Sequence, residues 1–260
     1  MIFYFSGTGN SRHAAFSLAR SDEKIFNIAD LMKESSLPSF DPDEGEAVGF
    51  VCPVYFCDLP LMMQDFMKKV SFSIVPSYIY AVFTCGGLSG LCQEKAESLL
   101  AENRLKLNAA WEVHMVANYV VMYDIPSEED QQKTLQEAEM QLALIKDEIW
   151  EESDHKITIS SQARALTEQM APIYLEAVKT HKFWIDDTCV GCGTCASRCP
   201  VQAITMLDGY PSWNTGKCQH CMCCIRCGAV EYGTTTHGRK RYTHPDLRKK
   251  KAAGDNAHCH

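Results

Sequence analysis

Short apolar runs alternate with amphipathic stretches along the first 125 residues of the chain. The runs are four to eight residues long, and they predict five strands, at Ile2 to Phe5, Lys24 to Ile28, Val48 to Cys52, Tyr78 to Thr84 and Trp111 to Asn118. The spacing of apolar residues between them predicts helices at Ser11 to Arg20, Leu61 to Val70 and Gly90 to Asn103. Buried strands separated by helices favour a parallel sheet covered on both faces, which is a doubly wound α/β domain.

Two further helices are predicted after this region. Ser127 is a good cap residue, an acidic turn follows it, and the buried face is expected to carry Leu135, Met140, Leu142, Leu144, Ile145 and Ile149. The second helical stretch, Ser160 to Lys179, leads into a cysteine-rich segment. No linker of Gly/Ser type separates the two parts, so we expect them to pack together.

Composition and charge narrow the class of protein. With 46% hydrophobic residues the chain can bury a core, and its formal charge of -8 gives no support to nucleic-acid binding. The start of the chain has no basic segment or small-residue cleavage site, so we read no signal peptide. The longest apolar run, Ala47 to Phe56, is too short to span a membrane. We therefore expect a cytoplasmic protein without a membrane span.

The strongest chemical signal is a run of cysteines. Of the 14 cysteines, nine fall between Cys189 and Cys227, and gaps of two residues in a cytosolic chain indicate metal binding and not disulfides. The first run has the spacing of a bacterial iron-sulfur ferredoxin, with a proline after its last member: Cys189, Cys192, Cys195 and Cys199. Zinc is the alternative, but a zinc ribbon would separate its cysteine pairs by a long loop.

A second run begins 29 residues after the first, with Cys218, Cys221 and Cys224. Its last cysteine, Cys227, follows after two residues where three are usual, and Cys223 is an extra thiol. The register with Cys224 is favoured, since a turn tightened toward 3₁₀ geometry would absorb the short gap, but Cys223 stays open. In a two-cluster ferredoxin the fourth cysteine of each run binds the other cluster. One cluster would then take Cys189, Cys192, Cys195 and Cys227, as 4Fe-4S or 3Fe-4S, and the other Cys199, Cys218, Cys221 and Cys224.

A second chemical signal follows the first strand, in the loop Ser6, Gly7, Thr8, Gly9, Asn10 and Ser11. The glycines let backbone N–H groups point into one concavity, the hydroxyl groups add donors, and the following helix adds partial positive charge. The loop lacks the lysine of a nucleoside-triphosphate site, and Arg12 stands where a dinucleotide fingerprint has its third glycine. These residues predict an anion-binding loop of another kind.

This loop resembles the FMN-phosphate loop of flavodoxins. The resemblance implies a flavodoxin-like five-stranded sheet with FMN beyond the carboxyl ends of its strands. The loops expected beside the flavin ring carry Pro53, Val54, Tyr55 and Phe56, then Thr84, Cys85, Gly86 and Gly87, with Tyr119 after the fifth strand. Tyr55 and Phe56 would offer a stacking face, and the two glycines would let amides approach the ring. Ordinary core packing and a simple turn remain the alternatives.

Over residues 1 to about 245 the chain resembles the two-domain flavodoxin/ferredoxin fusions of anaerobic bacteria, the EFR-family ferredoxins. Met122-Tyr123-Asp124 and Glu231-Tyr232-Gly233 add to the resemblance. It implies four parts: a flavodoxin-like FMN-binding domain at 1–150, a helical connector at 151–182, a two-cluster ferredoxin-like domain at 183–245 and a flexible basic tail at 246–260.

The function expected from this resemblance is electron transfer. Single electrons would pass between FMN and two 4Fe-4S clusters, and redox partner proteins, which the sequence does not identify, would supply and accept them. The alternative is a flavin-dependent reductase of a small molecule, fed through the clusters. The sequence shows no persuasive acid/base pair for it, so no catalytic residue is predicted.

Overall fold

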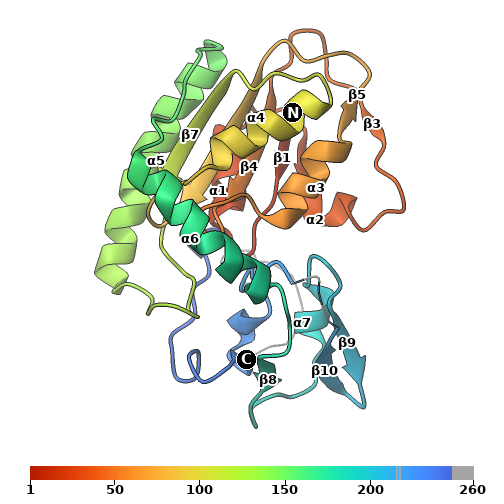
Figure 1. Ribbon diagram of the computed structural model, residues 1–260, viewed down its shortest axis with the longest axis vertical. Helices are drawn as coiled ribbons and strands as arrows, with labels where there is room; N and C mark the ends of the chain where they lie inside the picture. Colours follow the sequence, from red (N-terminus) through yellow and green to blue (C-terminus); the bar gives the residue numbers. More distant parts are fainter. Residues whose placement is uncertain (215, 217, 248–260) are drawn as a thin grey trace.

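Five parallel strands form the main sheet of the protein, whose computed structural model describes residues 1–214, 216 and 218–247. In chain order they are β1 (Ile2–Tyr4), β2 (Ile25–Asn27), β4 (Val48–Pro53), β6 (Ile79–Cys85) and β7 (Ala109–His114). Their order across the sheet is β2-β1-β4-β6-β7, the second, first, third, fourth and fifth sheet strands. Figure 1 labels β7, β4 and β1 of this sheet. This is the flavodoxin-like order. The five predicted strands and the parallel sheet are confirmed.

Helices cover both faces of the sheet. One face packs against α1 (Asn10–Leu18) and α5 (Glu128–Trp150), with Tyr80 and Trp111 in its core. The other packs against α2 (Ile28–Leu31), α3 (Leu61–Lys69) and α4 (Cys92–Glu102), around a cluster of phenylalanines that includes Phe3, Phe50 and Phe66. Because successive strand residues point to opposite faces, each central strand contributes to both cores.

The buried stripe of α5 differs from the prediction. Ala138, Leu142, Ile145 and Ile149 face the sheet, a spacing of three or four residues that keeps them on one side of a helix. Met140 and Leu144, which were expected on that face, are 63% and 66% exposed. Each lies two residues from Leu142, which is more than half a turn away.

Smaller elements complete this part. β3 (Ser39–Phe40) pairs in parallel with β5 (Ser71–Phe72), and these two-residue strands are too short for a sequence pattern to reveal. The second predicted helix is present as α6 (Ser161–Ala177), and the hydroxyl of Ser160 caps it by accepting a hydrogen bond from the amide of Ala163. α6 runs from the sheet toward the C-terminal part of the chain (Figure 1).

The C-terminal part is built from two antiparallel strand pairs. β8 (Phe183–Ile185) pairs with β11 (Val230–Tyr232), and β9 (Ile204–Leu207) pairs with β10 (Tyr210–Trp213). The short helix α7 (Thr194–Ser197) lies between β8 and β9 in sequence, and the 3₁₀ turn η1 (Ile225–Cys227) lies between β10 and β11.

The end of the chain differs in part from the predicted flexible tail. Asp246 and Leu247, its first two residues, pack against the first part of the chain through His13 and Gly9. Residues 248–260 lie outside the described residues. Within the described part of the chain, no helix is both long and apolar enough to cross a membrane.

Candidate cofactor site

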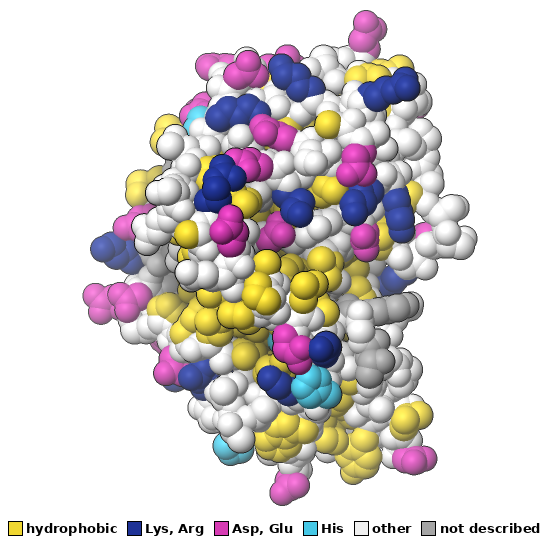
Figure 2. Space-filling view, in the orientation of Figure 1, with side chains coloured by type: hydrophobic (Ala, Val, Ile, Leu, Met, Phe, Trp, Pro, Cys, Tyr) yellow, Lys and Arg dark blue, Asp and Glu magenta, His cyan; other side chains and the backbone are white. Residues whose placement is uncertain are grey.

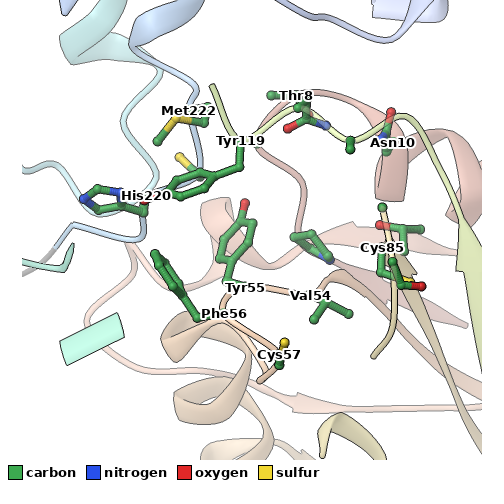
Figure 3. A pocket seen from close by; sticks show the side chains of 18 of the residues that line it. Thr8, Asn10, Val54, Tyr55, Phe56, Cys57, Cys85, Tyr119, His220 and Met222 are labelled. Atoms are coloured by element: carbon green, nitrogen blue, oxygen red, sulfur yellow. Dashed lines mark hydrogen bonds between the residues drawn. The ribbon is translucent and has the colours of Figure 1, made fainter. Parts of the chain in front are cut away.

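A cavity of about 500 Å³ lies beyond the carboxyl ends of the sheet strands, where the two parts of the chain meet. Every residue predicted to bind the flavin lines it, with the exception of Gly9. The cavity also has walls from α6 and from the second cysteine run, which were not predicted. Figure 3 shows Thr8 and Asn10 on one side of it, Tyr55 inside, and His220 and Met222 across from the strand ends.

The loop between β1 and α1 has the features of an anion site. Among the described residues, no hydrogen bond occupies the backbone N–H groups of Gly7, Thr8, Asn10 and Ser11. These groups lie at the N-terminus of α1, where they favour a bound anion. Gly9 is the cap residue at φ 110° and faces away from the cavity.

Two of the predicted hydroxyl donors fasten this loop. Ser6 Oγ accepts the amide hydrogen of Gly9 at 3.1 Å, and the hydroxyls of Ser11 and Thr84 hydrogen-bond to each other at 2.7 Å. The hydroxyl of Thr8 makes no hydrogen bond to any other described residue. Thr8 is therefore the side chain best suited to donate to an anion.

The side chain of Asn10 is held at both ends. Its Nδ2 donates to the carbonyl of Val116 at 3.1 Å, and its Oδ1 accepts from the hydroxyl of Tyr242 at 2.9 Å. Asn10 therefore acts on the loop by fixing its position, and its own backbone N–H remains for the anion.

The loop after β4 makes a tight turn beside the cavity. Tyr55 and Asp58 exchange both backbone hydrogen bonds, and the residues between them, Phe56 and Cys57, have φ values of 53° and 61°. Such values are unusual outside glycine and often accompany a functional site. Phe56 stacks on Tyr174 of α6, with ring centroids 4.9 Å apart, so Tyr174 covers one face of Phe56.

The loop after β6 packs closely on the loop after β7. A Cβ at Gly86 would lie 2.6 Å from the Cβ of Ala117, whereas a Cβ at Gly87 would meet nothing within 4 Å. Cys85 is buried beside them, and this burial, with the nearby Glu112 carboxylate, raises the pKa of its thiol to about 12. Its thiol is therefore protonated at pH 7 and acts as a small apolar side chain.

The second cysteine run forms one wall of the cavity. Gln219 Oε1 accepts the amide hydrogen of Met62 at 2.9 Å, at the start of α3, and His220 Nδ1 lies 2.9 Å from the hydroxyl of Tyr119. The carbonyl oxygen of Cys221 would lie 2.0 Å from a Cβ at Gly7, so this segment rests directly on the anion-binding loop. His220, Cys221 and Met222 all line the cavity. Burial lowers the pKa of His220 to about 4, so its ring is neutral at pH 7.

The two cysteine runs share one backbone conformation. Gly191 and Gly193 have φ values of 66° and 72°, and 29 residues later His220 and Met222 have values of 50° and 60°. This correspondence aligns Cys224 with Cys195. The α-helical turn Thr194–Ser197 of the first run corresponds to residues 223–226 of the second, and the 3₁₀ turn Ile225–Cys227 overlaps the end of that stretch. The thiol of Cys223 lies 3.6 Å from the carbonyl of Arg198.

Thiols of the two cysteine runs lie close to one another. Cys189 and Cys227 lie near enough to Cys195 to add to the effect of burial, which raises its pKa to about 11. Cys199, Cys218, Cys223 and Cys195 raise the pKa of the buried Cys224 in the same way. Backbone amides of Ala203 and His220 point at the sulfurs of Cys199 and Cys218, at 3.2 and 3.3 Å, as amides do around iron-sulfur clusters.

The mouth of the cavity is apolar. Leu166 and Met170 of α6 line one side, and Met122 and Tyr123, which are 54% and 43% exposed, line another. Figure 2 shows hydrophobic side chains gathered on this face where α6 crosses between the two parts. The helical spacing of α6 predicted a helix but not that it would cover the strand ends.

A family model matches one segment of the C-terminal part. The 4Fe-4S binding domain matches residues 182–205, which contain the whole first cysteine run. No curated protein matches the chain.

Solved structures resemble the chain over about half its length. A putative flavoprotein from Bacteroides uniformis is 15% identical, covers 44% of this chain and 88% of its own, and gives a TM-score of 0.36. A flavodoxin from Streptococcus pneumoniae TIGR4 is 14% identical, covers 55% and 97%, and gives a TM-score of 0.31.

The two parts can be classified from the sheet and the family match. The strand order of the first part is that of flavodoxins, and the second part contains the matched iron-sulfur segment. The chain is thus a fusion of a flavodoxin-like domain with a 4Fe-4S binding domain, a combination that indicates electron transfer.

Proposed function

We propose that this protein carries electrons between one FMN and two 4Fe-4S clusters. The anion-binding loop fits the terminal phosphate of FMN, because a helix N-terminus converges there with amides and a hydroxyl that make no hydrogen bond within the described residues. No second nucleotide fingerprint accompanies it in the sequence, which favours FMN over FAD. Tyr55 and the loops after β6 and β7 are the residues suited to hold the flavin ring.

The proposed ligands follow the cysteine spacing of a two-cluster ferredoxin. The first cluster takes Cys189, Cys192, Cys195 and Cys227, and the second takes Cys199, Cys218, Cys221 and Cys224. The repeat of positive φ values favours Cys224 over Cys223 as the third ligand of the second run.

The observation that carries the proposal is the position of Cys221. This proposed cluster ligand lines the cavity and contacts the anion-binding loop at Gly7. The residue that would bind the cluster is therefore also part of the wall that would contact the flavin. When bound, FMN exchanges one or two electrons and the clusters exchange one each, so the pair links two-electron to one-electron chemistry. Gln219 and Tyr119 hold the wall in place through their hydrogen bonds across the junction.

Replacing Thr8 and Asn10 with alanine in one double variant should release the flavin and leave both clusters intact. The Thr8 change removes a donor to the phosphate, and the Asn10 change removes the side chain that fixes the loop. Flavin and iron per chain are measured after anaerobic purification. Thr134→Ala, on α5 and outside the lining of the cavity, serves as the control. Unchanged flavin content in the double variant would show that this loop is not the FMN site.

The apolar mouth supports a second candidate, a flavin-dependent reductase of a small apolar molecule. Met122 and Tyr123 line the cavity and are also partly exposed to solvent. Dithionite-reduced protein mixed anaerobically with a set of quinones separates the two functions. Saturable turnover with one quinone favours the reductase, whereas slow reaction with all of them, without saturation, favours the electron carrier.

A further inference from the structure

After β11 the chain returns to the first part of the molecule as a segment that we term the strap, Arg239–Leu247. Arg239 anchors its beginning: Nη1 donates to the carbonyl of Val120 at 2.7 Å, and Nε lies 3.1 Å from the carboxylate of Asp124. The strap then passes behind the anion-binding loop, on the side opposite the cavity, and ends against α1.

The strap holds the backbone of the loop. The amide of His244 donates to the carbonyl of Thr8 at 2.9 Å. The space beside Gly9 is filled, because a Cβ there would lie 2.7 Å from the Cβ of His244 and 2.8 Å from a methyl group of Leu247. His13 of α1 stacks on His244, with ring centroids 4.2 Å apart, and its Nδ1 lies 2.5 Å from a carboxylate oxygen of Asp246.

One side chain of the strap reaches through to the loop itself. The hydroxyl of Tyr242 donates to Asn10 Oδ1 at 2.9 Å, and both side chains are buried, at 3% and 7% exposure. With Nδ2 of Asn10 bound to the carbonyl of Val116, the amide plane is fixed between the strap and the loop after β7. The backbone N–H of Asn10, at the first turn of α1, is thereby held in one orientation.

We propose that Tyr242 is a positioning residue for the FMN phosphate, acting through Asn10. The inference rests on the proposed function, because it takes this loop to be the phosphate site. A loop amide held in place before the ligand arrives binds an anion without a further ordering cost. A residue that follows the iron-sulfur segment thus contributes to the flavin site from the far side of the loop.

The test compares FMN with riboflavin, which has the same ring system and ribityl chain but no phosphate. Both ligands are titrated by equilibrium dialysis into full-length, cluster-loaded protein, wild type and Tyr242→Phe. The variant should bind FMN roughly three- to tenfold more weakly, as expected for one lost buried hydrogen bond, and should bind riboflavin as the wild type does. Tyr210→Phe, at an exposed position of β10 in the C-terminal part, is the matched control and should change neither Kd.

Each outcome has a distinct meaning. An equal loss for FMN and riboflavin would overturn the inference, because a general packing defect would then explain it, and so would an unchanged Kd for FMN. Iron content is measured on the same samples to show that the clusters are retained. A wild-type protein that does not prefer FMN to riboflavin would instead refute the phosphate loop and the proposed function with it.

Discussion

Gly7→Ala is expected to lose most of its FMN and to lower the free energy of unfolding by about 1–3 kcal/mol, the usual cost of overpacking a closed site. Gly7 does not have a positive φ, so alanine suits its backbone. The added Cβ would nevertheless lie 2.0 Å from the carbonyl oxygen and 2.8 Å from the Cβ of Cys221. Either the anion-binding loop or the second cysteine run must therefore move. The contact between Gly7 and Cys221, which forms part of the cavity wall, is then lost.

Flavin per chain and chemical denaturation measure this effect. Gly45→Ala provides the control: its φ is +78° and a Cβ there meets nothing within 4 Å, so it should cost about 1 kcal/mol through backbone strain and keep its flavin. If Gly7→Ala retains flavin and stability at the level of Gly45→Ala, the close contact between the loop and Cys221 is wrong.

Cys227→Ser is expected to remove the first cluster, and with it roughly half of the iron, because a serine hydroxyl is a poor ligand where a fourth thiolate is needed. Both Cys189 and Cys227 lie near the thiol of Cys195, and the 3₁₀ turn brings Cys227 there despite the short gap after Cys224. Iron per chain and EPR of the anaerobically reduced protein measure the loss.

Cys223→Ser is the matched control in the same segment. The Cys223 thiol is placed against the carbonyl of Arg198, where a hydroxyl of similar size also fits, so iron content should stay near the wild-type level. Should Cys223→Ser lose iron while Cys224→Ser keeps it, the register with Cys224 is refuted and Cys223 is the ligand.

The sheet and the anion-binding loop could be predicted because their signals are local. Residues 48–52 and 79–85 are unbroken buried runs, which are typical of central parallel strands. The loop from Ser6 to Ser11 follows the first strand directly, so its place at the end of the sheet follows from topology. The first cysteine run is equally local, with four cysteines in eleven residues.

The contacts that close the site depend on residues far apart in sequence. Gly7 meets Cys221, and Asn10 meets Tyr242, across more than 200 residues, and no local pattern encodes such a pairing. The hydroxyls of Ser6 and Ser11 looked like phosphate donors, but their hydrogen bonds to Gly9 and Thr84 became visible only in the folded chain. The last two residues of the strap, Asp246 and Leu247, fall within the predicted flexible tail. The residues that they pack against, on α1 and in the loop before it, are too distant in sequence for a local pattern to reveal the contact.

The central claim is tested most directly by cofactor analysis of the anaerobically purified wild-type protein. Flavin, iron and acid-labile sulfide are quantified, and EPR spectra are recorded during stepwise reduction with dithionite. The proposed function predicts one FMN and two 4Fe-4S clusters per chain, with both flavin and clusters reduced in the titration. Zinc in place of iron, or clusters without any redox-active flavin, would contradict it.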